Sequence, residues 1–135
     1  MTQVIVLRRL ADPCALGAWA DRAGFRDGLP ANWHVTIAKA TRSAVLDAFP
    51  RVDRPLTVPA STDRLVGRMG GIIALMFRSP AIEQRHRQIS IAGAEWEHHN
   101  FRCHVTFAVD DGRDLYDLRP FSGRLIFSAE EWLVR

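Results

Sequence analysis

One tripeptide, His-Val-Thr, occurs twice in this chain. The copies are His34-Val35-Thr36 and His104-Val105-Thr106. The composition of the chain would give about 0.02 copies by chance, so a repeated triplet indicates a function. On a β-strand, residues two apart point to the same face, so each His shares a face with its Thr while the Val points the other way. If the two strands lie together, two imidazoles and two hydroxyls meet at one place.

These four groups are suited to cleaving a phosphodiester. The unperturbed pKa of histidine is about 6.5, so near neutral pH one imidazole can accept a proton while the other donates one. Threonine hydroxyls can donate hydrogen bonds to phosphoryl oxygens, and an imidazolium stabilises the negative charge of the transition state. A single strand histidine is more often structural, but the duplicated motif favours catalysis. We therefore predict His34, Thr36, His104 and Thr106 as catalytic residues, with no metal and no cofactor.

The elements that must position these residues follow from hydrophobic periodicity and from turn residues. A proline stands at the first helical position of two predicted helices, at Pro13 after Asp12 and at Pro80 after Ser79. The sequence predicts strands over residues 4–9, 33–39, 56–59, 65–68, 72–78, 101–109, 125–128 and 132–134, and helices over 12–24, 43–49 and 79–92.

The order of these elements predicts one α+β domain over residues 1–135. Each half has a proline-started helix that is followed, about ten residues later, by a strand with the His-Val-Thr motif. We therefore expect two lobes related by a pseudo-twofold axis, with antiparallel sheets lining a central cleft and helices outside.

Composition narrows the class of partner. The chain is 47% apolar and 24% charged, as in ordinary globular proteins, and its net charge is +3. This excess is too small to predict binding to long DNA, although 17 of the 18 basic residues are arginine, which suits an anionic ligand. Cys14 and Cys103 lack metal or disulfide spacing, which fits a reducing compartment. The first residues do not have the pattern of a signal peptide, and no apolar run could span a membrane, so a cytoplasmic protein is expected.

Three further sets of polar residues are candidates for ligand or metal contacts. Arg102 stands two residues before His104, and therefore on the same face of the predicted strand, so a phosphate contact is expected. The acidic and histidine residues at 95–99 do not have a metal-ligand spacing, so no metal site is predicted there. Arg85 and His86 lie on a predicted helix, where we expect a solvated or salt-bridged face.

Two H-x-T motifs 70 residues apart in a small α+β chain resemble the 2H phosphoesterase superfamily, which includes the LigT-like RNA cyclic phosphodiesterases. Further segments are similar to a phage anti-CBASS nuclease branch, whose members cut cyclic di- and trinucleotide alarm signals. These segments are Leu29-Pro30, 83–86, 92–96, 101–107, 118–123 and 130–132.

The resemblance implies roles for individual residues. Both His and both Thr of the motifs would be catalytic. A C-terminal glutamate and an aromatic residue would line the nucleotide site, and these match Glu130 and Trp132, with Glu131 as an alternative to Glu130. The first strand of this chain has no aromatic residue, so base stacking from that strand is in doubt. Three residues could take that place: Arg8, Arg9 and Tyr116.

The resemblance also implies a reaction and a partner. A ribose 2′-hydroxyl would attack the adjacent 3′–5′ phosphodiester of a cyclic oligonucleotide and give a 2′,3′-cyclic phosphate. A 2′,3′-cyclic or 2′–5′ RNA phosphodiesterase, acting on a short RNA-like ligand, is the alternative enzyme. A nucleotide-binding sponge or a phage particle component is the alternative outside enzymes. The expected compartment is the host bacterial cytoplasm if a phage encodes the chain. Ring size, base preference, the first base and the oligomeric state are left open.

Overall fold

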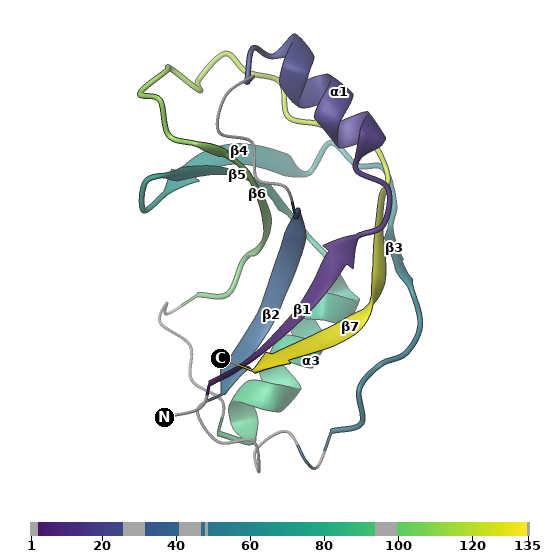
Figure 1. The fold of residues 1–135 in the computed structure, drawn as a ribbon. Helices are drawn as coiled ribbons and strands as arrows, with labels where there is room; N and C mark the ends of the chain where they lie inside the picture. The colour runs from purple at the N-terminus through teal and green to yellow at the C-terminus, as the bar shows by residue number, and fades with distance from the viewer. Residues whose placement is uncertain (1–2, 26–31, 41–46, 48, 94–99, 135) are drawn as a thin grey trace.

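The computed structural model describes residues 3–25, 32–40, 47, 49–93 and 100–134. Seven strands form one curled antiparallel sheet in the order β3-β7-β1-β2-β6-β5-β4, with two helices beside it (Figure 1). The elements along the chain are β1 (Val4–Leu10), α1 (Cys14–Arg22), β2 (His34–Ala40), β3 (Leu56–Val58), β4 (Arg64–Met69), β5 (Ile72–Phe77), α3 (Pro80–Ile91), β6 (Cys103–Val109) and β7 (Leu125–Val134).

The mixed α+β class and the antiparallel pairing agree with the sequence prediction, but two details differ. The expected sheets are joined into one, because β2 and β6 pair at Val35 and Val105. The two strands predicted over 125–128 and 132–134 are one strand, β7, because β1 pairs with it from Val134 to Phe127 and keeps the polar stretch between them extended. The helix predicted over 43–49 falls almost entirely outside the described residues.

Both predicted proline-started helices are present, with one shift in register. In α3 the Ser79 hydroxyl accepts the Ile82 N–H at 3.3 Å and Pro80 takes the first helical position, as predicted. Helix α1 begins one residue later than expected, because Pro13 itself is the N-cap residue. The Asp12 carboxylate still accepts the backbone N–H of the first helical residue at 3.0 Å.

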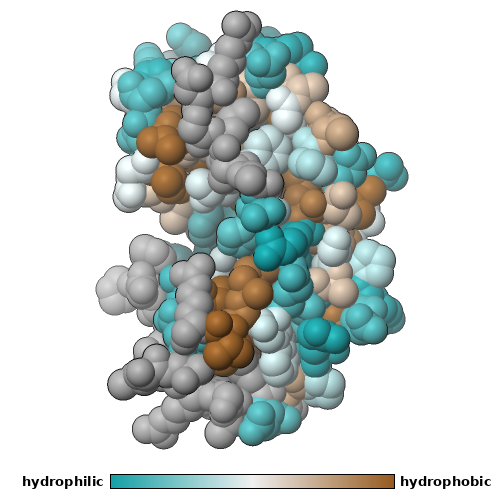
Figure 2. Space-filling view, viewed as in Figure 1, coloured by the Kyte–Doolittle hydropathy of each residue, from teal (hydrophilic) through white to brown (hydrophobic). Residues whose placement is uncertain are grey.

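The two helices cover the same face of the sheet, which we call the helix face. Val35 and Val105 are fully buried on it. Phe107 of β6 packs edge-on against Trp19 of α1, with 5.3 Å between ring centroids, and α3 contacts β2. The opposite face is called the motif face. The surface in the view of Figure 2 is a mosaic of hydrophilic and apolar residues, not one continuous apolar face. Among the described residues, no helix is long and apolar enough to cross a membrane.

Candidate functional site

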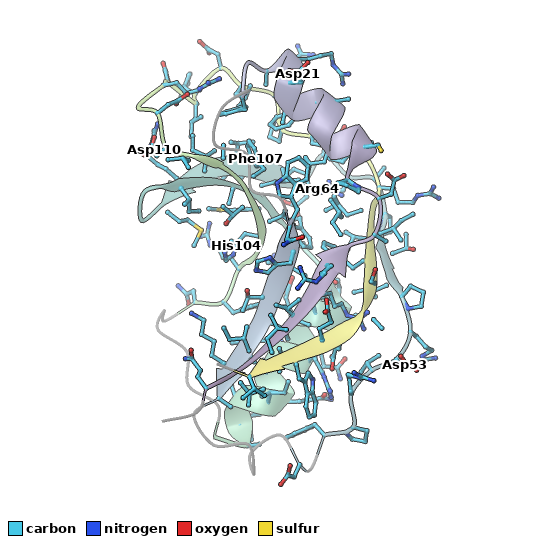
Figure 3. The ribbon with its side chains drawn as sticks, viewed as in Figure 1. Asp21, Asp53, Arg64, His104, Phe107 and Asp110 are labelled. Atoms are coloured by element: carbon cyan, nitrogen blue, oxygen red, sulfur yellow. The ribbon has the colours of Figure 1, made fainter. Side chains whose placement is uncertain are left out.

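The two His-Val-Thr motifs lie side by side where β2 meets β6. Val35 is paired with Val105 in an antiparallel register, so position 34 lies across from 106 and position 36 across from 104. The two valines are buried on the helix face, whereas the four His and Thr side chains are partly exposed on the motif face. The structure thus brings His34, Thr36, His104 and Thr106 together on one face, and Figure 3 labels His104 at this position.

The two motif imidazoles are held in the same way. His34 Nδ1 lies 3.1 Å from the carbonyl oxygen of Asn32, and His104 Nδ1 lies 2.9 Å from that of Arg102. A carbonyl oxygen only accepts hydrogen bonds, so Nδ1 carries the hydrogen in each ring. Nε2 is then the nitrogen that gains or loses a proton, so each imidazole can serve as a base when neutral and as an acid when charged.

Each motif strand also has a β-bulge directly after its threonine. Ile37 and Phe107 are the extra residues, because the strands that flank the motif strands skip them. The register passes from Leu7↔Thr36 to Val6↔Ala38 between β1 and β2, and from Ala74↔Thr106 to Ile73↔Ala108 between β5 and β6. Bulges bend a strand and re-aim its side chains, and they are enriched next to active sites.

An ion pair borders the motifs on the same face. Arg9 is the β1 partner of His34, so it shares the motif face. Leu7 of β1 pairs with Thr36 on one side and with Glu131 of β7 on the other, so Glu131 shares this face as well. Arg9 Nε lies 2.6 Å from Glu131 Oε2, and these side chains are 37% and 39% exposed. Arg8 and Arg9 are the two first-strand residues that could replace the missing aromatic, and of these Arg9 lies on the motif face.

The structure does not bring Glu130 to the motif face. Glu130 is paired with Arg8, which is paired with Val35, so both charged side chains point to the helix face and are buried there. Glu130 receives two hydrogen bonds from Arg85 of α3, at 2.8 and 3.0 Å, and one from the Val52 N–H at 3.2 Å. Burial lowers the pKa of Arg8, a shift that the Glu130 carboxylate opposes.

Trp132 also lies away from the motif face. Trp132 is the β1 partner of Val6, which places it on the helix face, where it packs against the core. Its indole N–H points to Glu130 at 3.4 Å. Tyr116 lies between β6 and β7 and is 91% exposed.

Arg102 borders both the motif and a cavity. Its carbonyl accepts the hydrogen bond from His104, and its side chain is exposed. A cavity of about 480 Å³ lies at this end of the sheet and is lined in part by Arg102, Leu65 and Met76. Met76 is the β5 partner of His104, so this part of the lining lies on the motif face, whereas Phe77 and Cys103 line the cavity from the helix face. Arg102 would therefore lie near a phosphate or base that is bound at His104.

The prediction for Arg85 and His86 holds for one residue and is wrong for the other. Arg85 is salt-bridged to Glu130, as expected for that face of the helix. His86 is buried instead of solvated, because α3 packs Ile82, His86 and Ile89 against the sheet. That spacing of four and three residues is the signal of a buried helix face, and it could have identified His86 from the sequence.

No group of three or more His, Cys, Asp or Glu side chains in the described part of the chain could hold a metal ion. The cluster at 95–99 lies outside the described residues. Both cysteines are free, with Cys14 exposed and Cys103 buried. Burial raises the pKa of the Cys103 thiol to about 12, which makes it a poor nucleophile.

Comparisons with known proteins agree on one family. A model of the family described as "Anti-CBASS protein Acb1" matches residues 5–133. The chain is 35% identical over 133 residues to a protein of that name from Caulobacter sp. (strain RHG1), and 30% identical over 139 aligned residues to one from Sphingomonas paeninsulae. Each match covers 93% of this chain but 21% and 22% of the relatives, so the chain spans about a fifth of their length. Residues 5–133, which the family model matches, include both motifs.

Proposed function

The chain belongs to the anti-CBASS protein Acb1 family, and from this premise we propose that it cleaves the cyclic di- and trinucleotide signals of bacterial antiphage defence. The observation that carries the proposal is the pair of motif imidazoles on one face, each with Nδ1 bound to a backbone carbonyl. Two equivalent groups that exchange protons at Nε2 suit a reaction that needs a base and an acid.

The proposed reaction has two proton transfers around one phosphorus atom. One imidazole removes the proton from a ribose 2′-hydroxyl as the oxygen attacks the adjacent phosphorus. The bond from phosphorus to the 5′-oxygen breaks, and the second imidazole protonates that oxygen. The products are a 2′,3′-cyclic phosphate and a free 5′-hydroxyl. Because His34 and His104 have the same hydrogen bond, either can start as the base, and water can open the cyclic phosphate with the two roles exchanged.

The threonines and the nearby charged residues complete the proposed site. Thr36 and Thr106 lie across from the opposite motif's histidine, where their hydroxyls can donate to phosphoryl oxygens. We assign substrate contacts to Arg9 and Glu131 at the His34 side and to Arg102 at the His104 side. Glu131 takes this role in place of Glu130, because Glu131 shares the motif face while Glu130 is buried beneath α3.

We also propose that the fold is that of the 2H phosphoesterases, with two halves related by a pseudo-twofold axis. Three repeated features support this proposal: the motif itself, the bulge after each threonine, and the hydrogen bond from each imidazole to the carbonyl two residues earlier. The metal-independent character of the reaction belongs to the same proposal.

Two other functions remain to be separated from this one. A 2′,3′-cyclic or 2′–5′ RNA phosphodiesterase would use the same imidazoles on a different ligand. A nucleotide-binding sponge or a phage particle component would bind or assemble without cleaving the ligand. Neither of these binding or structural roles requires two imidazoles prepared for proton transfer.

The proposal is tested by incubating the protein with cyclic dinucleotides, cyclic trinucleotides, linear RNA and 2′,3′-cyclic mononucleotides, with product analysis by chromatography. We expect cleavage of a cyclic di- or trinucleotide at the same rate with and without EDTA. Preferred cleavage of linear RNA or of the mononucleotides would favour the RNA enzyme. Tight binding without product would favour the sponge, and loss of activity in EDTA would contradict a metal-independent reaction.

A further inference from the structure

His86 connects helix α3 to both motif strands from behind the sheet. Its Nδ1 lies 2.7 Å from the carbonyl oxygen of Ile37, the bulge residue that directly follows Thr36 in β2. Its ring stacks on Phe101, with 4.0 Å between the ring centroids and 12° between the planes. Phe101 stands two residues before the start of β6. One buried side chain thus contacts the two segments that carry the motifs.

The contact to β2 has a defined direction. Since the Ile37 carbonyl can only accept, Nδ1 of His86 carries the hydrogen and donates it. Nε2 lies 3.3 Å from the Ser90 hydroxyl, which donates to it when the ring is neutral. Burial lowers the pKa of His86, the hydrogen bond to the Ile37 carbonyl opposes this shift, and the charge of Arg87 adds to it; the net direction is downward, so the neutral ring is favoured near pH 7.

This hydrogen bond acts on a part of β2 that the β-ladder itself leaves irregular. Ile37 has no register partner in β1, because the pairing passes directly from Thr36 to Ala38. The conformation of a bulge determines the direction of the side chains beside it. The donor on α3 therefore holds β2 at the residue whose conformation sets the direction of the Thr36 and His34 side chains.

The contact to the second strand acts through a short segment of chain. Phe101 is followed directly by Arg102, whose carbonyl oxygen accepts the hydrogen bond from His104 Nδ1. The stacked His86 ring restrains Phe101, so it also restrains the carbonyl that sets the tautomer of His104. The same side chain thus bears on His34 and Thr36 through Ile37 and on His104 through Phe101.

We propose that His86 is a positioning residue that holds the two His-Val-Thr motifs in their reactive arrangement from the helix face. The proposal rests on the proposed function, since it assigns to His86 an effect on that reaction. His86 itself does not touch the substrate, because it lies on the opposite side of the sheet from the motif side chains. We therefore expect its replacement to change kcat and to leave KM nearly unchanged.

The test compares His86→Asn with His86→Gln. The asparagine amide can occupy the place of Nδ1 and still donate to the Ile37 carbonyl, whereas the glutamine amide reaches toward the place of Nε2. We expect kcat of His86→Gln to fall about tenfold to hundredfold, as for a small misplacement of reacting groups, and kcat of His86→Asn to recover most of that loss. KM stays within about twofold in both. Ser90→Ala, which removes only the partner of Nε2, is the matched control and keeps wild-type kcat.

Three results would overturn the proposal: wild-type kcat in His86→Gln, equal losses in the Gln and Asn variants, or a loss that appears in KM alone. If the variants do not fold, nitrogen NMR of the wild-type protein decides, because a hydrogen on Nε2 of His86 instead of Nδ1 would contradict the assigned bond. The proposed function has its own test, and it fails if the wild-type protein does not cleave a cyclic di- or trinucleotide or if folded His34→Ala keeps wild-type turnover. In that case the inference about His86 fails with it.

Discussion

Replacement of Glu130 by alanine should destabilise the protein far more than the same replacement of Glu131, its neighbour on the motif face. The Glu130 side chain is 1% exposed, and its carboxylate accepts hydrogen bonds from Nε and Nη2 of Arg85 and from the Val52 N–H. Buried Arg8 lies close enough for its charge to interact with this carboxylate. Alanine at 130 therefore leaves two guanidinium groups, one of them buried, without the negative charge that compensates them.

The expected size of the effect follows from this burial. Breaking a buried ion pair by removing one partner costs about 3–5 kcal/mol, because the other charge remains in a poorly solvated place. A domain of this size has a free energy of unfolding of about 5–15 kcal/mol, so about a fifth or more of it would be lost. With a urea m-value of about 2 kcal/mol per molar, the unfolding midpoint would fall by about 2 M.

The neighbouring residue supplies the matched control. Glu131 forms an ion pair with Arg9 in which both side chains are more than one-third exposed, and such pairs contribute about 0–1 kcal/mol. We expect Glu131→Ala to leave the urea midpoint almost unchanged and to weaken turnover of the cyclic oligonucleotide. Equilibrium unfolding in urea, followed by tryptophan fluorescence and circular dichroism, measures both variants. A loss below about 1 kcal/mol for Glu130→Ala, or equal losses for the two variants, would refute the assignment of the two glutamates to opposite faces.

Two further predictions concern titration and reactivity. In the native protein a thiol reagent should modify exposed Cys14 only. Cys103 is buried and its pKa is raised to about 12, so it should react only after denaturation. Mass spectrometry of the labelled protein tests this, and modification of both cysteines in the folded state would contradict it. Folding lowers the pKa of His86, so below about pH 6.5 the unfolded chain binds more protons at this residue than the folded protein does. The stability that the neutral ring contributes is therefore lost as the pH falls from about 6.5 through the pKa of the folded protein. The urea midpoint should therefore fall more between pH 7.5 and 5.5 in the wild type than in His86→Asn, and equal pH dependence would refute this link.

The placement of the four motif residues could be predicted from the sequence because it depends on local alternation. Residues two apart on a strand share a face, and a buried valine between them decides which face is inside. The two proline-started helices could be predicted for the same reason, because the signal lies in neighbouring residues: the Ser79 cap and Pro80 mark the start of α3. The direct pairing of β2 with β6 could not be predicted in the same way, because it depends on contacts between residues far apart in the chain, and the sequence predicts separate sheets.

The assignment of Glu130 and Glu131 could not be settled from the sequence. Two adjacent glutamates on a strand must point to opposite faces, but which one faces the motifs depends on the register of β7 against β1. That register shifts between Arg8 and Leu10, and this irregularity follows from the long-range pairing of the strands. A resemblance between short segments indicates which stretch of chain lies near the site. It does not indicate which residues of that stretch point to the site and which point to the opposite face of the sheet.

The central claim is that His34 and His104 act together as base and acid, and the turnover number of their alanine variants tests it most directly. Each imidazole is anchored through Nδ1 to the backbone and lies on the exposed motif face, so its removal should leave the fold intact. We expect kcat for a cyclic di- or trinucleotide to fall at least about a hundredfold in His34→Ala and in His104→Ala, with wild-type circular dichroism and thermal unfolding. Retention of kcat within about tenfold by either folded variant would contradict the two-histidine mechanism.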